Sequence, residues 1–215
     1  MADTTVKMKG DMQSNVFEGI SAVFAVKDGF TFSNGTGGDT GKKVLSLTSD
    51  AALLEFPCSE DSGFSFDTGA PSIEHFKVHG LNADWVSTFT PGDTELNLEI
   101  PCHDTSIMQF CFGTTGVDMK ISLPTNPAAL KDTTASGVFE GKAFGPSQKS
   151  IECGLLILDD TEKRLFFVTK AKLTAQVTFD GSNKPLCVVL SGSLSETGET
   201  SFGILDLQAS QTAGE

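Results

Sequence analysis

The sequence KLTAQVTFDGSNKPLCVVL, residues 172–190, has the pattern of a β-hairpin. From Leu173 to Phe179 apolar and polar residues alternate, which places the apolar side chains on one face of a strand. The run Asp180–Lys184 is rich in turn-forming residues, and Leu186–Leu190 is a second apolar run of strand length. This stretch therefore predicts two antiparallel strands joined by a turn.

Runs of the same kind recur along the whole chain. They are Phe64–Phe66, Leu96–Ile100, Val117–Leu123, and Gly154–Leu158, which turns at Asp159–Lys163 into Leu165–Thr169. Short strands with frequent turns are typical of a β-sandwich or barrel. We expect a mainly β fold, a single-domain β-sandwich over residues 1–215 with flexible arms at about 1–14 and 208–215 and a long exposed loop over Ser33–Lys43. Most phenylalanines are expected on core faces, among them Phe64, Phe66, Phe166, Phe167 and Phe179.

One α-helix is expected between the strands. Asp104 is a good N-cap, and Gly113 suits the position just after the last helical residue. Ile107, Phe110 and Cys111 share one face at helical spacing, so the segment Thr105–Phe112 should pack on a sheet. A shorter helical turn is predicted at Asn126–Leu130, because Asn caps helices and Pro127 suits the first helical position.

The charge balance argues against a nucleic-acid-binding protein. The 215 residues hold 15 basic and 28 acidic side chains, giving a net charge of −13, and Arg164 is the only arginine. Phosphate binding needs a basic face, which this acidic chain lacks. An acidic protein can instead form a surface to which DNA does not adhere. No run approaches the ~20 apolar residues of a membrane-spanning helix. The N-terminal MADTTVKMKGDMQS lacks the apolar region of a secretory signal, so we expect synthesis and folding in the cytosol.

No motif for catalysis, cofactor binding or metal binding is complete. The glycine-rich loop fails both the P-loop and the dinucleotide-binding patterns. His75 and His79 share a face and would need His103 or an acidic residue as a third ligand to bind zinc. Cys102-His103-Asp104 cannot form a relay, because neighbours on a strand point to opposite faces. The five cysteines are scattered, so we expect reduced core residues and no intrachain disulfide. We expect a protein that is not an enzyme and takes no cofactor.

Three longer segments resemble a known family. They are GFSFDTGAPSIEHFKVHG (Gly63–Gly80), WVSTFTPGDTELNLEIPCHDTSIMQFCFG (Trp85–Gly113) and KRLFFVTKAKLTAQVTFDGSNKPLCVVLSGSLSE (Lys163–Glu196). Together they are similar to the tail tube, or major tail, proteins of long-tailed bacteriophages. The likeness consists of turn chemistry, alternating strands and a capped helix, and the three segments comprise 81 of the 215 residues. The first 60 residues carry none of it.

The resemblance implies a structural virion protein. In that family a β-sandwich flanked by a helix assembles into hexameric rings, the inner sheets join into a barrel, and stacked rings guide DNA from the capsid to the cell. The partners implied are further copies of the chain and the tape-measure, tail-terminator and baseplate proteins, with DNA passing without specific binding and no membrane involved. The protein would be made in the bacterial host cytoplasm and would reside in the virion tail.

Two strands are candidates for the lumen wall of such a tube, which should be neutral to acidic and poor in lysine. In the first, Leu96, Leu98 and Ile100 face the core, which leaves the opposite face to Glu95, Asn97 and Glu99. In the second, the outer face carries Thr174, Gln176 and Thr178. The sequence does not choose between these strands. The alternative function is a non-enzymatic β-sandwich binding module, such as a capsid decoration, host-surface or carbohydrate-binding domain, with Trp85 as its anchor.

Overall fold

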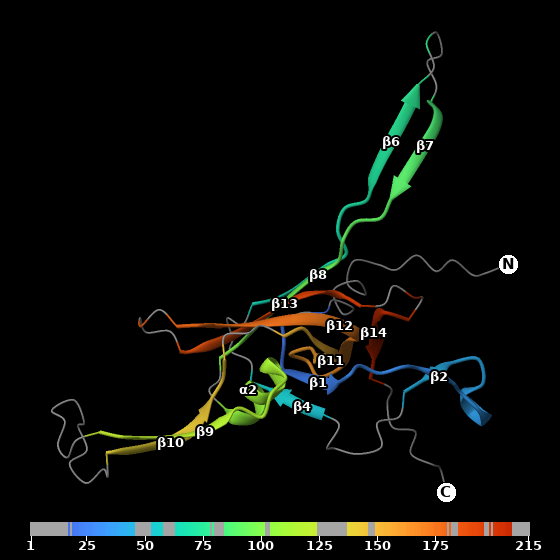
Figure 1. Ribbon diagram of the computed structural model, residues 1–215. Coiled ribbons are helices and arrows are strands. Elements are labelled where there is room, and N and C mark those ends of the chain that lie inside the picture. The colour runs from blue at the N-terminus through green and yellow to red at the C-terminus, as the bar shows by residue number, and fades with distance from the viewer. Residues whose placement is uncertain are drawn as a thin grey trace, which may run out of the picture. The chain divides into compact units, whose positions relative to one another are not determined.

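The computed structural model is mainly β (Figure 1). The residues it describes are 17, 19–45, 53–57, 63–77, 79, 84–101, 104–123, 137–145, 149–179, 181, 185–195, 198 and 200–207, without the side chains of residues 38, 77 and 84–86. The arms predicted at 1–14 and 208–215 and the turn predicted at Asn126–Leu130 lie outside these residues, as do Cys58, Cys102 and His103.

The strands are short, apart from one. They are β1 (Ala22–Lys27), β2 (Ser33–Asn34), β3 (Lys43–Val44), β4 (Leu53–Phe56), β5 (Phe64–Asp67), β6 (Ser72–Lys77), β7 (Asp84–Thr90), β8 (Glu95–Ile100), β9 (Val117–Ser122), β10 (Val138–Ala143), β11 (Ile151–Leu158), β12 (Arg164–Thr178), β13 (Cys187–Leu194) and β14 (Phe202–Asp206). A 3-10 turn, η1 (Gly37–Asp39), and the α-helix α2 (Thr105–Phe112) complete the described elements.

Most of the strands form one large sheet in the order β4-β1-β11-β12-β13-β8-β5, and β14 also pairs with β12. The hairpin predicted over residues 172–190 is confirmed, because Ala171–Thr178 pairs antiparallel with Cys187–Leu194. The predicted turn at Asp159–Lys163 is confirmed as well, since β11 ends before it and β12 begins after it. Three separate two-stranded ribbons are β2–β3, β6–β7 and β9–β10.

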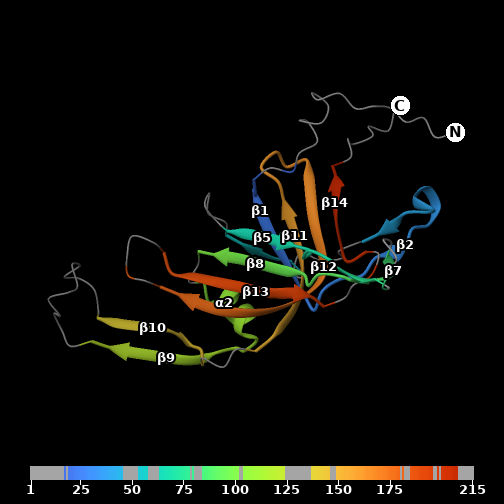
Figure 2. The same ribbon diagram turned by 90° about the horizontal axis from the view of Figure 1, so that it is seen from above.

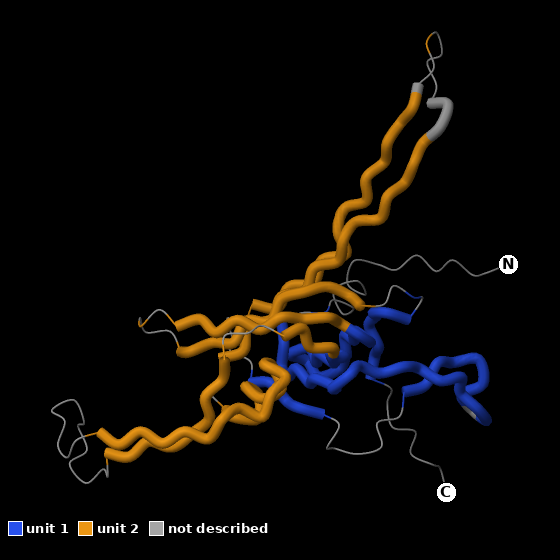
Figure 3. The backbone as a smooth tube through the Cα atoms, in the orientation of Figure 1, with its two compact units in different colours: residues 1–60, 153–170, 196–215 blue, residues 61–152, 171–195 orange. Residues whose placement is uncertain are grey.

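The chain divides into two compact units (Figure 3). Unit 1 comprises residues 1–60, 153–170 and 196–215, and unit 2 comprises residues 61–152 and 171–195. Strand β12 belongs to both, with its first half in unit 1 and its second half in unit 2. The expectation of a single β-sandwich domain stays a prediction.

The core of unit 1 is aromatic and aliphatic. Val26, Phe30, Leu156 and Phe167 form a buried cluster, and the rings of Phe30 and Phe167 lie 6.5 Å apart. Gly154 is required beneath this cluster, because a Cβ there would collide with the Phe30 ring. Burial of these apolar side chains supplies the main driving force for folding of the unit.

The turn between β11 and β12 is built around one buried carboxylate. Asp159 accepts hydrogen bonds from the amides of Lys163 (2.9 Å) and Arg164 (3.0 Å) and from Thr161 Oγ1 (2.7 Å). Burial by itself raises the pKa of Asp159, but the hydrogen bonds from Thr161, Arg164 and Lys163 and the Arg164 charge outweigh it, so the pKa lies below its ordinary value. The anionic form of Asp159 therefore stabilises this turn.

The predicted helix is confirmed at both ends. The Asp104 carboxylate accepts hydrogen bonds from the amides of Ser106 (2.7 Å) and Ile107 (3.3 Å), and Gly113 adopts the left-handed conformation with φ of 61°. Helix α2 packs against β13 (Figure 2). Its Phe112 ring is buried and stacks on Phe144 at 5.7 Å. A short helix of this length is stable because its apolar side is covered.

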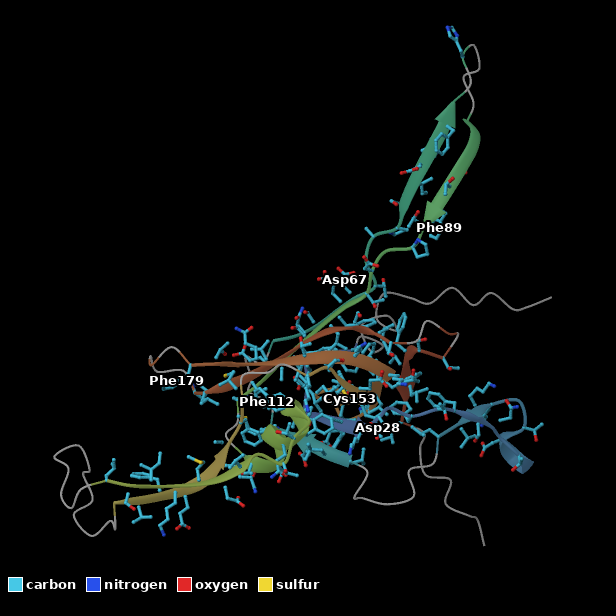
Figure 4. The ribbon with its side chains drawn as sticks, in the orientation of Figure 1. Asp28, Asp67, Phe89, Phe112, Cys153 and Phe179 are labelled. Carbon is cyan, nitrogen blue, oxygen red and sulfur yellow. The ribbon has the colours of Figure 1, made fainter. Side chains whose placement is uncertain are left out.

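One expectation is corrected. Phe179 is 66% exposed, because it lies just beyond the last paired residue of β12 rather than on a core face (Figure 4). The segment Ser33–Lys43 is exposed for the most part, as predicted, and its two ends pair as β2 and β3 on either side of η1. Its lysines make local contacts, Lys42 with Asp39 at 3.4 Å and Lys43 with Asn34 at 2.8 Å.

Candidate functional site

The two strands proposed from sequence for a lumen wall present their polar side chains on one face of one sheet. Asn97 of β8 lies opposite Ser191 of β13, and Ser191 in turn lies opposite Thr174 of β12. On the other side of Asn97 lies Ser65 of β5. Directly opposed residues in antiparallel strands point to the same face of the sheet. The sequence left open whether β8 or β12 forms the candidate wall, and the pairing places the polar side chains of both strands on the same surface.

The neighbouring rows extend this surface, which we call the polar face. Glu99 is opposite Val189, which is opposite Gln176, while Glu95 is opposite Asp67. The polar face consists of Ser65 and Asp67 of β5, Glu95, Asn97 and Glu99 of β8, Val189, Ser191 and Ser193 of β13, and Lys172, Thr174, Gln176 and Thr178 of β12. Cys187 of β13 lies opposite Thr178 at the end of this face but is buried. All four strand segments belong to unit 2, and β8, β12 and β13 lie side by side in Figure 2.

The opposite face of the same strands is core. Leu96, Leu98 and Ile100 of β8 are all at most 1% exposed, as the alternation predicts. Leu173 of β12 and Leu190 of β13 are likewise fully buried. The alternation stops being informative near the end of β12, where Val177 is 39% exposed. Burial of this apolar side determines which way the polar residues point, because a strand slipped by one residue would exchange its two faces.

The polar face is hydrated and carries a small negative charge. Glu95, Thr174, Gln176 and Thr178 are exposed, whereas Asn97 and Glu99 are half-buried. The acidic residues Asp67, Glu95 and Glu99 stand against the single basic residue Lys172, so the face has a net charge of −2. The Asp67 carboxylate also accepts a hydrogen bond from the Gly69 amide at 2.8 Å, which stabilises the turn after β5.

Hydrogen bonds along this face are local. The Thr174 hydroxyl donates to the Ser191 carbonyl at 3.2 Å, within the row that also holds Asn97. Serine, threonine and amide side chains can bind water or another polar surface without presenting a fixed charge. The arrangement is therefore suited to contact with solvent or a hydrated ligand rather than to bond-making chemistry.

The metal and nucleophile candidates do not come together in the part of the chain that the structure describes. No group of three or more His, Cys, Asp or Glu side chains there is able to hold a metal ion. His75 lies on β6 and His79 in the connection to β7, while His103 falls outside the described residues. Cys153 is buried in β11, and burial raises the pKa of its thiol to about 12. A thiol with that pKa is not a nucleophile near neutral pH.

Sequence reasoning missed half of the polar face. Ser65, Asp67, Ser191 and Ser193 belong to it through pairing between strands that are far apart in the chain. The apolar run Leu186–Leu190 hides the orientation of β13, because it has no alternation to reveal which residues face the core. Only the pairing register supplies that information.

Comparisons with known proteins add no assignment: no protein-family model matches the sequence, and a search of curated proteins finds no relative. Among the described residues, none of the helical structure has the length and apolar character needed to traverse a lipid bilayer. Function must therefore be inferred from the geometry of the polar face and of the exposed ribbons.

Proposed function

We propose that the chain is a structural virion protein, the subunit of a phage tail tube in which hexameric rings stack into a conduit for DNA ejection. The observation that carries the proposal is the four-stranded antiparallel segment β12-β13-β8-β5, which is apolar and buried on one side and polar and weakly acidic on the other. A wall of this kind buries its own core and presents a wet surface to whatever passes along it.

Closure into a ring needs sheet edges that pair between copies. Strand β5 ends the strand order of the large sheet and is only four residues long, as edge strands in natural proteins often are. Six copies of four strands would give a barrel roughly 50 Å across between backbones, from the usual strand spacing and tilt. Such a barrel is larger than those that already leave an aqueous channel, so a DNA duplex would pass through it.

The charge of the polar face favours passage over binding. With a net charge of −2 on each copy, a ring of six would carry roughly −12 on its inner wall, which disfavours lysine–phosphate contacts. Carboxylates and small polar groups keep the duplex hydrated and mobile. In this proposal DNA passes without specific binding, and the chain has no catalytic role and no cofactor.

The further partners follow from the same proposal. The ends of a tube of stacked rings would contact tape-measure, tail-terminator and baseplate proteins, and the finished protein would reside in the virion tail after synthesis in the host cytoplasm. A β-sandwich of this kind flanked by α2 would place its polar residues inward and its helix away from the lumen.

Size-exclusion chromatography with negative-stain microscopy tests this proposal. Rings or tubes with sixfold end views are the expected result. A small monodisperse species that binds glycans would instead support the binding-module alternative and would overturn the tube.

A charge reversal tests the role of the polar face itself. In assembled particles, Glu95→Lys combined with Glu99→Lys should slow DNA ejection and make it salt-sensitive while tail morphology stays normal, because each lysine adds a screened phosphate contact. Glu55→Lys is the matched control, since Glu55 is an exposed strand carboxylate on β4 in unit 1. Equal ejection by both variants at low and high salt would place the polar face outside the channel.

A further inference from the structure

The β9–β10 ribbon has one fully apolar side. Ile121 is opposite Phe139, Met119 is opposite Gly141 and Val117 is opposite Ala143, so these residues share a face. Leu123 continues the same side, because its amide bonds to the Gly137 carbonyl at 2.8 Å. We call this set the apolar stripe; its exposed fractions are Val117 65%, Met119 49%, Ile121 57%, Leu123 40% and Phe139 51%. Alternation in Val117–Leu123 predicts a core face, yet within the single chain that face is exposed.

The other side of the β9–β10 ribbon carries charged side chains that pair across the two strands. Lys120 Nζ lies 2.7 Å from Glu140 Oε1, and Lys142 Nζ lies 2.7 Å from Asp118 Oδ1, both across the strand pair. Ion pairs on an exposed surface contribute little stability, and an isolated two-stranded hairpin is marginal in water. The ribbon therefore needs a partner on its apolar stripe, while its charged side needs none.

The β6–β7 ribbon presents apolar groups on both of its sides. Ile73 and Phe89 are directly opposed and are 54% and 61% exposed (Figure 4). Phe76 is 52% exposed and points to the other side of the ribbon, three residues along β6 from Ile73. The Ile73–Phe89 side, with two large apolar side chains opposite each other, is the side that gains more from being covered.

The base of this ribbon carries it away from the sheet. Strands β6 and β7 continue β5 and β8, which pair with each other, so the ribbon extends the end of that pair (Figure 1). Gly69 and Gly92 allow the two connections to pass in close contact, because a Cβ at Gly69 would collide with the backbone of Asp93 and of Gly92. The geometry of this narrow base presents the ribbon to a surface beyond its own sheet.

We propose that the apolar stripe of one copy receives the Ile73–Phe89 side of the β6–β7 ribbon of a second copy. The proposal rests on the proposed function in that the second copy is a neighbour in the assembly. Both ribbons are built on a strand of six residues, about 20 Å long, so one can lie along the other. Two such ribbons pack face to face as sheets do, about 10 Å apart.

The size of the apolar stripe agrees with this occupant. Five large apolar side chains, each about half exposed, present on the order of 400–500 Å². A standard interface buries about 800 Å² on each partner, of which 56–65% is apolar, so the stripe has about the right apolar area. Pairing stripe with stripe would leave both sides of the β6–β7 ribbon uncovered, whereas the unlike pairing covers the apolar stripe and the Ile73–Phe89 side together and propagates from copy to copy.

Disulfide trapping between two chains that each carry one introduced cysteine tests the proposal; the native Cys111, Cys153 and Cys187 remain in both chains and are buried. One chain carries Ile121→Cys and the other, with a different tag, carries Phe89→Cys, both in a background with Cys58→Ser and Cys102→Ser. Under mild oxidation at micromolar concentration, the mixed disulfide should form about 100-fold faster than between free chains, because docking brings the effective thiol concentration into the millimolar range. Lys120→Cys is the matched control, since it is one residue away on the charged side of the same ribbon.

Imaging the same samples by negative-stain microscopy separates the docking of the ribbons from the formation of a tube. A mixed disulfide with Ile121→Cys and none with Lys120→Cys supports the docking, and a chain with both cysteines should then give a ladder of covalent oligomers. Rings or tubes with no preference for Ile121→Cys overturn the docking and leave the tube standing. The mixed disulfide in irregular fibres keeps the docking and overturns the tube, whereas a monomer without disulfide overturns the docking. Met119→Cys repeats the test in case Ile121→Cys does not fold.

Discussion

Truncation of Leu98 to alanine should destabilise the protein strongly, because Leu98 lies between the half-buried Phe64 and the buried Leu190 and is 1% exposed. The change removes about three buried carbon groups at about 0.8 kcal/mol each and leaves a cavity, so the free energy of unfolding should fall by about 3 kcal/mol. For a chain of this size, that corresponds to a loss of about 6–12 °C in melting temperature.

Asn97→Ala is the matched control, because Asn97 is the next residue on the same strand and points to the polar face. Its cost should stay below about 1 kcal/mol. Urea unfolding followed by circular dichroism measures both variants against the unmodified chain. If Asn97→Ala costs as much as Leu98→Ala, the polar face is packed inside the protein and the two-sided wall is wrong.

Three further outcomes are expected. Asp104→Ala should cost about 1 kcal/mol in urea unfolding, since it removes the carboxylate that caps α2. The pKa of Asp159 is lowered in the folded protein, so its carboxylate contributes full stability above the unfolded pKa near 3.9 and loses that contribution as the pH falls through the lower folded pKa. Asp159→Asn should therefore flatten the dependence of the unfolding free energy on pH below about pH 4. Cys153 should resist alkylation in the native protein at pH 8 and react once the chain is unfolded, because burial raises its pKa to about 12. Peptide mass mapping measures this, and labelling of the folded protein as fast as that of an exposed thiol would contradict the burial of Cys153.

The sequence predicts those parts of the fold whose signals are local. The cap residues Asp104 and Gly113 define α2 at both ends because N-caps and left-handed glycines act within a few residues. Alternation places Leu96, Leu98 and Ile100 in the core for the same reason. The β12–β13 hairpin follows from two strand-sized runs around a turn.

Other features depend on partners that a local pattern does not name. Alternation in Val117–Leu123 indicates that one side needs an apolar partner, but not that this side is exposed on the β9–β10 ribbon. The row of Ser65, Asn97, Ser191 and Thr174 depends on register between strands that are far apart in sequence. Sequence reasoning found the polar residues of β8 and Thr174, Gln176 and Thr178 of β12. It missed Lys172 and the polar residues of β5 and β13, because strand pairing depends on segments that are far apart in the sequence.

The most direct test of the account is a cryo-electron microscopy reconstruction of the assembled protein at a resolution that separates strands. Sixfold rings in which Asn97, Ser191 and Thr174 line the inner wall and α2 lies outside it are the expected result. A tube with these residues on its outer surface, or an assembly without a channel, would contradict the central claim.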